Sequence, residues 1–364
     1  MNIPLIKAVD GCIGRLLTRL LPMPLWRALN THPLSVLLIR PGGIGDAVLL
    51  APLINSIKNL YPAVHITVLA EQRNVGVYKL IPSVDQVYCY DRPAEFWHAV
   101  RSRYDLVIDT EQWHRLSAVV TRLIPASVKI GFGTNERRRM FTHSVSYSED
   151  DYEAVSFMRL LEPLTGPGKL PDTPAPFLNV PLNAATAAEK LLKPLGESRF
   201  VVVFSGASIP ERRWGADRFR QITKVLAEHG YCVVVVGALA DRADGDQITA
   251  EGGLNLAGQT SIAETAGVIA RSELLVSGDS GMLHIAVGLG IPTVSLFGPG
   301  RSLKWAPHGE SHIVLNRQFD CSPCTTFGTT PHCPYEARCM QEITVAEVIE
   351  AAIRLLNEKQ RQAS

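Results

Sequence analysis

The chain has 364 residues, of which 46% are apolar, and it carries 36 Lys plus Arg against 35 Asp plus Glu. This size allows a large core in about two domains, which excludes a small cross-linked scaffold and a disordered tail. The net charge of +1 argues against a nucleic-acid partner, because such binding depends on clustered Lys and Arg.

The first segment, residues 1–32, is predicted to contain an uncleaved amphipathic helix. Its apolar residues fall near one helical face and are Leu5, Ile13, Leu16, Leu17, Leu20 and Leu21, with Lys7, Arg15 and Arg19 at the rim. This pattern favours docking on an anionic membrane surface; the alternative is that the stripe packs on the protein itself or on a second subunit. No apolar run reaches the roughly 20 residues that cross a bilayer.

Short apolar runs then alternate with helical patterns, which predicts a Rossmann-like domain over residues 33–162. The expected strands are Ser35–Ile39, Val64–Ala70, Val87–Tyr90 and Asp105–Asp109, with a helix over Ala47–Leu60. Residues 163–181 contain six prolines, which neither a helix nor a central strand would accept, and are predicted to be a linker.

A second alternation predicts another Rossmann-like domain over residues 182–342, followed by a C-terminal helix over 343–364. Its expected strands are Phe200–Phe204, Tyr231–Val236, Leu274–Ser277 and Thr293–Phe297, and its helices are Ala216–His229, Ile262–Arg271 and Met282–Leu289. Ligands of open α/β sheets bind at the carboxyl ends of the strands, so we expect two facing domains with the site in a cleft between them.

Residues 40–46, Arg-Pro-Gly-Gly-Ile-Gly-Asp, connect a predicted strand to a helix. The glycines of this segment can bring backbone amides close to a ligand, and a carboxylate is favoured near a helix N-terminus; the alternative to a functional role is that Asp46 only caps that helix. Val48 replaces the third glycine of a dinucleotide fingerprint, which argues against a nicotinamide cofactor. The turn is supplied by three glycines, Gly42, Gly43 and Gly45.

Two loops of the second half favour an anionic ligand. Residues 277–284 run from a strand into a helix, where free amides bind phosphate oxygens, and His284 follows about one turn later; packing of His284 is the alternative. Residues 205–214 combine hydroxyl groups with Arg212 and Arg213, and Arg contacts phosphate in a bidentate manner. The alternative for this loop is a solvated segment over a packed Trp214.

Together with Gly258–Glu264 and Leu296–Pro299, these motifs resemble glycosyltransferase family 9, the ADP-heptose:lipopolysaccharide heptosyltransferases, over residues 36–356. The resemblance implies a GT-B type fold and an inverting single displacement, with Asp46 as the catalytic base. It also implies a donor-binding set made of Ser208, Arg212, Asp241, Asp279, Ser280, Gly281, Met282 and His284. A nucleotide diphosphate is already a good leaving group. The enzyme therefore needs one base for the acceptor hydroxyl and cationic or amide donors for the departing charge, and it needs no second catalytic carboxylate.

Two local clusters remain. Cys321, Cys324, Cys333 and Cys339 are spaced for a tetrahedral structural Zn or Fe site, with reduced free thiols as the alternative. The run of basic residues that would contact acceptor phosphates, or simply be solvated, is Arg137, Arg138 and Arg139.

We therefore expect an enzyme that transfers heptose from ADP-heptose to a lipopolysaccharide core acceptor without a catalytic cofactor. It would work in the cytoplasm, peripherally attached to the inner face of the cytoplasmic membrane. The alternatives are a glycosyltransferase of the same fold with another donor or a protein acceptor, and a non-catalytic nucleotide-binding module.

Overall fold

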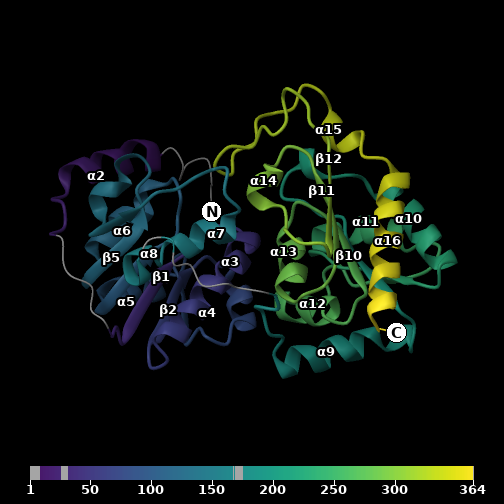
Figure 1. The fold of residues 1–364 in the computed structure, drawn as a ribbon, viewed down its shortest axis with the longest axis horizontal. Helices are drawn as coiled ribbons and strands as arrows, with labels where there is room; N and C mark the ends of the chain where they lie inside the picture. The colour runs from purple at the N-terminus through teal and green to yellow at the C-terminus, as the bar shows by residue number, and fades with distance from the viewer. Residues whose placement is uncertain (1–8, 26–31, 167, 169–174, 364) are drawn as a thin grey trace. The chain divides into compact units, whose positions relative to one another are not determined.

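The computed structural model describes residues 9–25, 32–166, 168 and 175–363. The chain divides into two compact units, residues 1–173 and 174–364. Each unit contains one six-stranded parallel sheet with helices packed on it (Figure 1).

The sheet of the first unit has the strand order β3-β2-β1-β4-β5-β6. The two middle strands, β1 and β4, are buried along nearly their whole length, as expected for continuous apolar runs in a parallel sheet covered on both faces. The strands are β1 Ser35–Ile39, β2 His65–Ala70, β3 Gln86–Cys89, β4 Tyr104–Asp109, β5 Ala126–Phe132 and β6 His143–Val145.

The predicted helix over Ala47–Leu60 is wrong in its bounds, because two helices meet at Leu50. Pro52 lacks an N–H and its ring cannot follow a helical turn, so it lies in the first turn of the second helix. The helices of this unit are η1 Asp10–Gly14, α2 Arg15–Leu20, α3 Ile44–Leu49, α4 Ala51–Leu60, η2 Val75–Leu80, α5 Pro93–Arg101, α6 Arg115–Leu123, η3 Asn135–Met140, α7 Glu153–Arg159 and α8 Glu162–Thr165.

The described part of the N-terminal segment, η1 and α2, packs against α6 and η3 through polar and small residues. Asp10, Gly14 and Thr18 are buried, and an Oδ1 atom of Asp10 accepts the N–H of Leu116 at 2.7 Å. Leu21 packs with the core cluster around Met140. Leu5 and Lys7, part of the predicted stripe, lie outside the described residues.

The second unit repeats the strand order of the first. Its sheet reads β12-β11-β10-β7-β8-β9, so that in both units the first strand of the unit lies beside the fourth. The strands are β7 Phe200–Phe204, β8 Cys232–Val235, β9 Leu254–Asn255, β10 Leu274–Gly278, β11 Thr293–Phe297 and β12 His312–Asn316.

One core of the second unit lies between the sheet and the helices α10 and α16, while α12 and α13 lie on the other side of β10 (Figure 1). Trp214 is buried in this core, and its Nε1–H donates to the carbonyl of Ile343 at 2.9 Å. The helices are α9 Leu182–Leu192, η4 Lys193–Leu195, η5 Pro210–Arg212, α10 Ala216–Glu228, η6 Leu239–Asp241, α11 Arg242–Ile248, α12 Ile262–Ile269, α13 Gly281–Gly288, α14 Ser302–Trp305, α15 Arg338–Gln341 and α16 Val345–Ala363.

The predicted linker, 163–181, is partly helical. Pro163 lies in the first turn of α8, where a missing N–H has no cost, and α8 ends at Thr165. Residues 167 and 169–174 of that stretch lie outside the described residues. The α/β fold class with two Rossmann-like sheets is confirmed.

Candidate active site

In each sheet the winding direction reverses between the first and fourth strands, and open α/β sheets bind ligands at the carboxyl ends of the strands at this point. In the first unit the loops after β1 and β4 meet this edge, and they contain residues 40–43 and 110–114. In the second unit the corresponding loops follow β7 and β10, and they contain residues 205–209 and 279–280.

Asp46 lies in the first turn of α3, with its two carboxylate oxygens held separately. Oδ2 accepts the backbone N–H of Gly43 at 3.3 Å, and Oδ1 accepts Nη2–H of Arg40 at 3.0 Å. The side chain remains 22% exposed. A carboxylate can accept about four hydrogen bonds, and Asp46 accepts two here. It can therefore still accept a hydrogen bond from a ligand hydroxyl.

Arg40, which the sequence did not single out as a site residue, lies beneath this turn with 3% of its side chain exposed. Its Nη1 donates to the carbonyl of Thr110 at 2.8 Å. Gly42 has a φ of +130°, and a Cβ there would lie 2.7 Å from Nη2 of Arg40, which explains the glycine. Burial opposes the charge, but three nearby carboxylates outweigh it and raise the pKa of Arg40, so the guanidinium stays protonated.

Glu111 is a second residue that the sequence missed. It is 6% exposed, its Oε1 accepts the N–H groups of Trp113 and His114 at 3.0 and 3.2 Å, and its Oε2 lies 4.0 Å from Nη2 of Arg40. Burial alone would raise the pKa of Glu111, but Arg40 and neighbouring positive groups lower it below its ordinary value. The sequence does contain a signal for Glu111, because the polar residues 110–112 directly follow the buried strand β4.

The basic run 137–139 does not act as one unit. Arg137 is fully buried, it lies 3.1 Å from Asp109, and it donates to the carbonyls of Glu111 and His114. It therefore has a structural role, and its prediction as an acceptor-binding residue is corrected, because the 3₁₀ turn η3 directs it inward. Arg138 is exposed and Arg139 is half-buried.

In the second unit Arg212 and Asp279 connect the loops after β7 and β10. Nη1 of Arg212 lies 3.1 Å from Oδ2 of Asp279, and 20% of the Arg212 side chain is exposed. Gly300 packs directly against Asp279, where a Cβ would clash. Ser208 is exposed on the same loop as Arg212. The guanidinium of Arg212 is thus oriented by a carboxylate and still reaches solvent.

The start of α13 combines a capped helix end with small residues. Ser280 caps the helix, since its Oγ accepts the N–H of Leu283 at 3.3 Å and lies 2.7 Å from Oγ of Ser277. Gly281 is the first helical residue and Met282 is buried behind it. The first amides of a helix have no partner within it, so this end favours an anion.

His284 is 2% exposed, and burial lowers its pKa to about 4, against a smaller opposing effect of Asp279. Its ring centroid is 6.4 Å from that of Trp305. Within the described part of the chain, Nδ1 has no hydrogen-bond partner. His284 is therefore neutral at pH 7 in the ligand-free protein and can offer a ligand a hydrogen bond.

Asp241 is engaged by the protein. Its Oδ2 accepts the N–H of Ala238 at 3.0 Å, and its Oδ1 lies 3.2 Å from Nη2 of Arg213. The carboxylate packs against Gly206, where a Cβ would lie 2.7 Å from Oδ2. Asp241 and Arg213 together brace the loop after β7.

The four clustered cysteines are free thiols of differing exposure. Cys321 is exposed, Cys324 and Cys333 are half-buried, and Cys339 is buried. Burial and the neighbouring cysteines raise the pKa of Cys324 and of Cys339. Among residues 9–25, 32–166, 168 and 175–363, no group of three or more His, Cys, Asp or Glu side chains is arranged to hold a metal ion.

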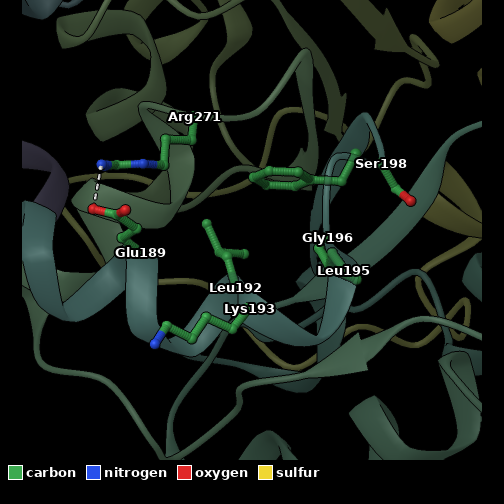
Figure 2. A pocket seen from close by; sticks show the side chains of 8 residues that line it. Glu189, Leu192, Lys193, Leu195, Gly196, Ser198 and Arg271 are labelled. Atoms are coloured by element: carbon green, nitrogen blue, oxygen red, sulfur yellow. Dashed lines mark ion pairs between the residues drawn. The ribbon is translucent and has the colours of Figure 1, made fainter.

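A pocket of about 350 Å³ lies away from these loops, at the amino end of β7 (Figure 2). Its lining includes Phe200, the first residue of β7, and Lys193, and it contains an ion pair of 3.8 Å between Arg271 and Glu189. None of the predicted site residues lines it. No helix in the described ranges is both long and apolar enough to cross a membrane.

Comparison with known proteins agrees with this fold. The family model "Glycosyltransferase family 9 (heptosyltransferase)" matches residues 94–333. The chain is 26% identical to lipopolysaccharide heptosyltransferase 3 of Escherichia coli over 342 residues, 86% of this chain and 96% of that protein.

Two solved structures share the fold. The family 9 glycosyl transferase of Veillonella parvula aligns with a TM-score of 0.76 at 20% identity, covering 91% of this chain and 99% of that one. The ADP-heptose lipopolysaccharide heptosyltransferase II of Escherichia coli aligns with a TM-score of 0.71 at 22% identity, covering 90% and 99%. The protein is a glycosyltransferase. More particularly, the chain belongs to glycosyltransferase family 9, the heptosyltransferase family.

The depressed pKa of His284 predicts a pH-dependent stability. Because its folded-state pKa of about 4 is below the ordinary 6.5, the unfolded chain binds a proton first as the pH falls between these values. His284 therefore costs about 1.4 kcal/mol of unfolding free energy per pH unit in that window. Urea unfolding at pH 7, 6 and 5 should show a shallower decline for His284→Gln than for wild type. The exposed His229→Gln is the control, and equal slopes for all three proteins would contradict the prediction.

Proposed function

We propose that the protein is an inverting glycosyltransferase that transfers heptose from ADP-heptose to a sugar of the lipopolysaccharide core. The observation that carries this proposal is the Asp46 carboxylate, which is oriented by two donors, partly exposed, and located at the strand end where Rossmann-like sheets bind ligands. The names of the relatives support the sugar and the acceptor.

In the proposed reaction Asp46 accepts the proton of an acceptor hydroxyl, and the hydroxyl oxygen attacks the anomeric carbon of heptose. A new C–O bond forms as the bond from that carbon to the diphosphate breaks, and ADP leaves with the bonding electron pair. A nucleotide diphosphate departs without protonation by a second acid, so one carboxylate and a set of positive or N–H donors are sufficient. The reaction as proposed uses no cofactor.

The donor site is proposed at the loops after β7 and β10. Arg212 reaches solvent while Asp279 orients it, so its remaining donors suit diphosphate oxygens. The amides at the start of α13 add uncharged donors, with Gly281 permitting close approach. Ser208 and neutral His284 add hydrogen-bonding groups. We assign Asp241 a supporting role beneath the loop after β7.

We further propose that η1 and α2 attach the enzyme to the anionic inner face of the cytoplasmic membrane. Ile13, Leu16 and Leu20 are 50, 56 and 70% exposed, whereas the side of this segment that faces the protein carries the buried Asp10, Gly14 and Thr18 together with Leu21. Arg15 and Arg19 flank the exposed face and share one carboxylate, Glu136. An apolar stripe with an excess of arginine suits an anionic lipid surface.

The cysteine cluster is proposed as a structural Zn or Fe site outside the reaction. The spacing supports this, and burial together with the neighbouring Cys333 and Cys321 raises the pKa of Cys324. As placed, the described side chains do not form a ligand set, so metal binding would have to draw the thiols together.

Replacing the base tests the mechanism. Asp46→Asn should lower kcat by roughly 10²-fold or more while leaving ADP affinity within a factor of two, because the donor site lies on other loops. Transfer assays and calorimetric titration with ADP measure the two effects. Near-normal turnover would remove Asp46 from the mechanism.

The adjacent arginines give a matched pair for donor binding. Arg212→Ala should raise the KM for ADP-heptose by roughly 10-fold, the effect of losing a charge-assisted contact. Arg213→Ala should raise it less, since Arg213 is held by Asp241 and Asp244. Equal, small effects of both variants on KM would indicate that residues 205–214 are a solvated loop without a role in donor binding.

Membrane attachment is testable on residues that contribute nothing to the core. The triple variant Ile13→Ser, Leu16→Ser, Leu20→Ser should lose co-sedimentation with phosphatidylglycerol vesicles and keep transfer to a soluble acceptor fragment. Leu182→Ser, at a residue 83% exposed on α9, is the control and should sediment as wild type does. Full vesicle binding by the triple variant would exclude this face as the anchor.

The metal proposal predicts one Zn or Fe per chain by elemental analysis of protein purified without chelator. Cys324→Ser should lower the melting temperature and the metal content, because metal binding contributes folding free energy. Cys232→Ser, a half-buried cysteine of β8, should keep the metal. A metal-free wild-type protein would reject the site.

A further inference from the structure

The Asp46 carboxylate is oriented by Arg40, a buried side chain that is itself held by contacts on several sides. Arg40 comes directly after β1, and its guanidinium bonds to Asp46 on α3 and to the carbonyl of Thr110 after β4. Gly42 packs against Nη2, and the ring of Phe157 lies 5.4 Å from Cζ. Arg40 therefore joins three elements at the strand end where ligands of this fold bind.

Glu111 restrains the other side of Arg40. Its Oε2 lies 4.0 Å from the Nη2 atom that bonds to Asp46, and its Oε1 is fixed by the backbone N–H groups of Trp113 and His114. Both carboxylates thus share one terminal nitrogen. Loss of either carboxylate would leave the buried guanidinium less compensated, so both carboxylates favour the observed orientation.

We propose that Arg40 is a positioning residue for the transfer step, and that Glu111 holds Arg40 in the orientation that directs Asp46 toward the acceptor hydroxyl. This inference rests on the proposed role of Asp46 as the base. Proton transfer requires the base within hydrogen-bond reach of the hydroxyl, and small displacements cost large factors in rate. The pair therefore affects kcat and leaves donor binding unchanged.

A double-mutant cycle separates positioning from general stability, because residues that act as a unit are not additive. Arg40→Gln should lower kcat by roughly 10- to 100-fold with the KM for ADP-heptose within two-fold of wild type. Introduced into Asp46→Asn, the same change should lower kcat by less than about two-fold, since no base remains to position.

Arg40→Lys keeps the charge and one donor, so it should recover part of the lost kcat. Glu111→Gln keeps the shape and an oxygen acceptor for the backbone, and its effect on kcat should also vanish in the Asp46→Asn background. If Arg40→Gln does not fold, these two milder variants complete the cycle. Lys129→Arg, at a buried cation of β5 whose Nζ donates to the carbonyl of Arg122 at 2.7 Å, is the control, and its effect should be the same with and without Asp46→Asn.

Four outcomes decide the inference. A folded Arg40→Gln with kcat within two-fold of wild type overturns it. If Arg40→Gln lowers kcat by the same factor in the Asp46→Asn background as in wild type, the inference is also overturned, while the proposed role of Asp46 as the base stands. Near-normal turnover of Asp46→Asn alone overturns the proposed function first, and the inference with it. Loss of kcat in Arg40→Gln that disappears in Asp46→Asn supports both.

Discussion

The arrangement of the loops after β1 and β4 depends on one interaction, the compensation of the buried positive charge of Arg40. A guanidinium that is 3% exposed is costly unless carboxylates and carbonyls surround it, and here Asp46, Glu111 and the carbonyl of Thr110 do so. These partners lie on segments that meet only because β1 and β4 are adjacent and parallel. The fold thus brings the carboxylates together, and the charge then fixes their direction.

The second unit uses arginine–carboxylate pairs for a different purpose. Arg212 is paired with Asp279 yet is 20% exposed. A ligand phosphate can therefore accept hydrogen bonds from Arg212 while the ion pair with Asp279 remains in place. Arg213 and Asp241 brace the same loop from below, with Gly206 permitting the close approach. This difference in exposure suits the two proposed roles, since Arg40 would orient the base and Arg212 would contact the donor substrate.

The sequence predicted the strands whose apolar runs are buried on both faces, because that pattern is local. The sequence did not indicate β5, β6, β9 or β12. The apolar run of β5 is interrupted by Lys129 and Gly131, β12 is only half-buried, and β6 and β9 have three and two residues. One continuous helix was expected where two helices meet at Leu50, before Pro52. The glycine-rich and basic loops of the sequence predict Asp46 and Arg212 as site residues, and the structure places both at the carboxyl ends of the strands. The sequence could not reveal the pairing of Arg40 with Glu111, which lies 71 positions further along the chain, since only the crossover connections bring them together.

In the proposed mechanism one oriented carboxylate drives a single displacement of heptose from ADP-heptose. The most direct measurement is the anomeric configuration of the product, determined by NMR after incubation of the purified enzyme with ADP-heptose and a truncated lipopolysaccharide core acceptor. The account predicts a new glycosidic linkage with the configuration opposite to that of the donor, together with one ADP released per sugar transferred. A product with the donor's configuration would contradict it, because a single in-line displacement inverts the anomeric carbon.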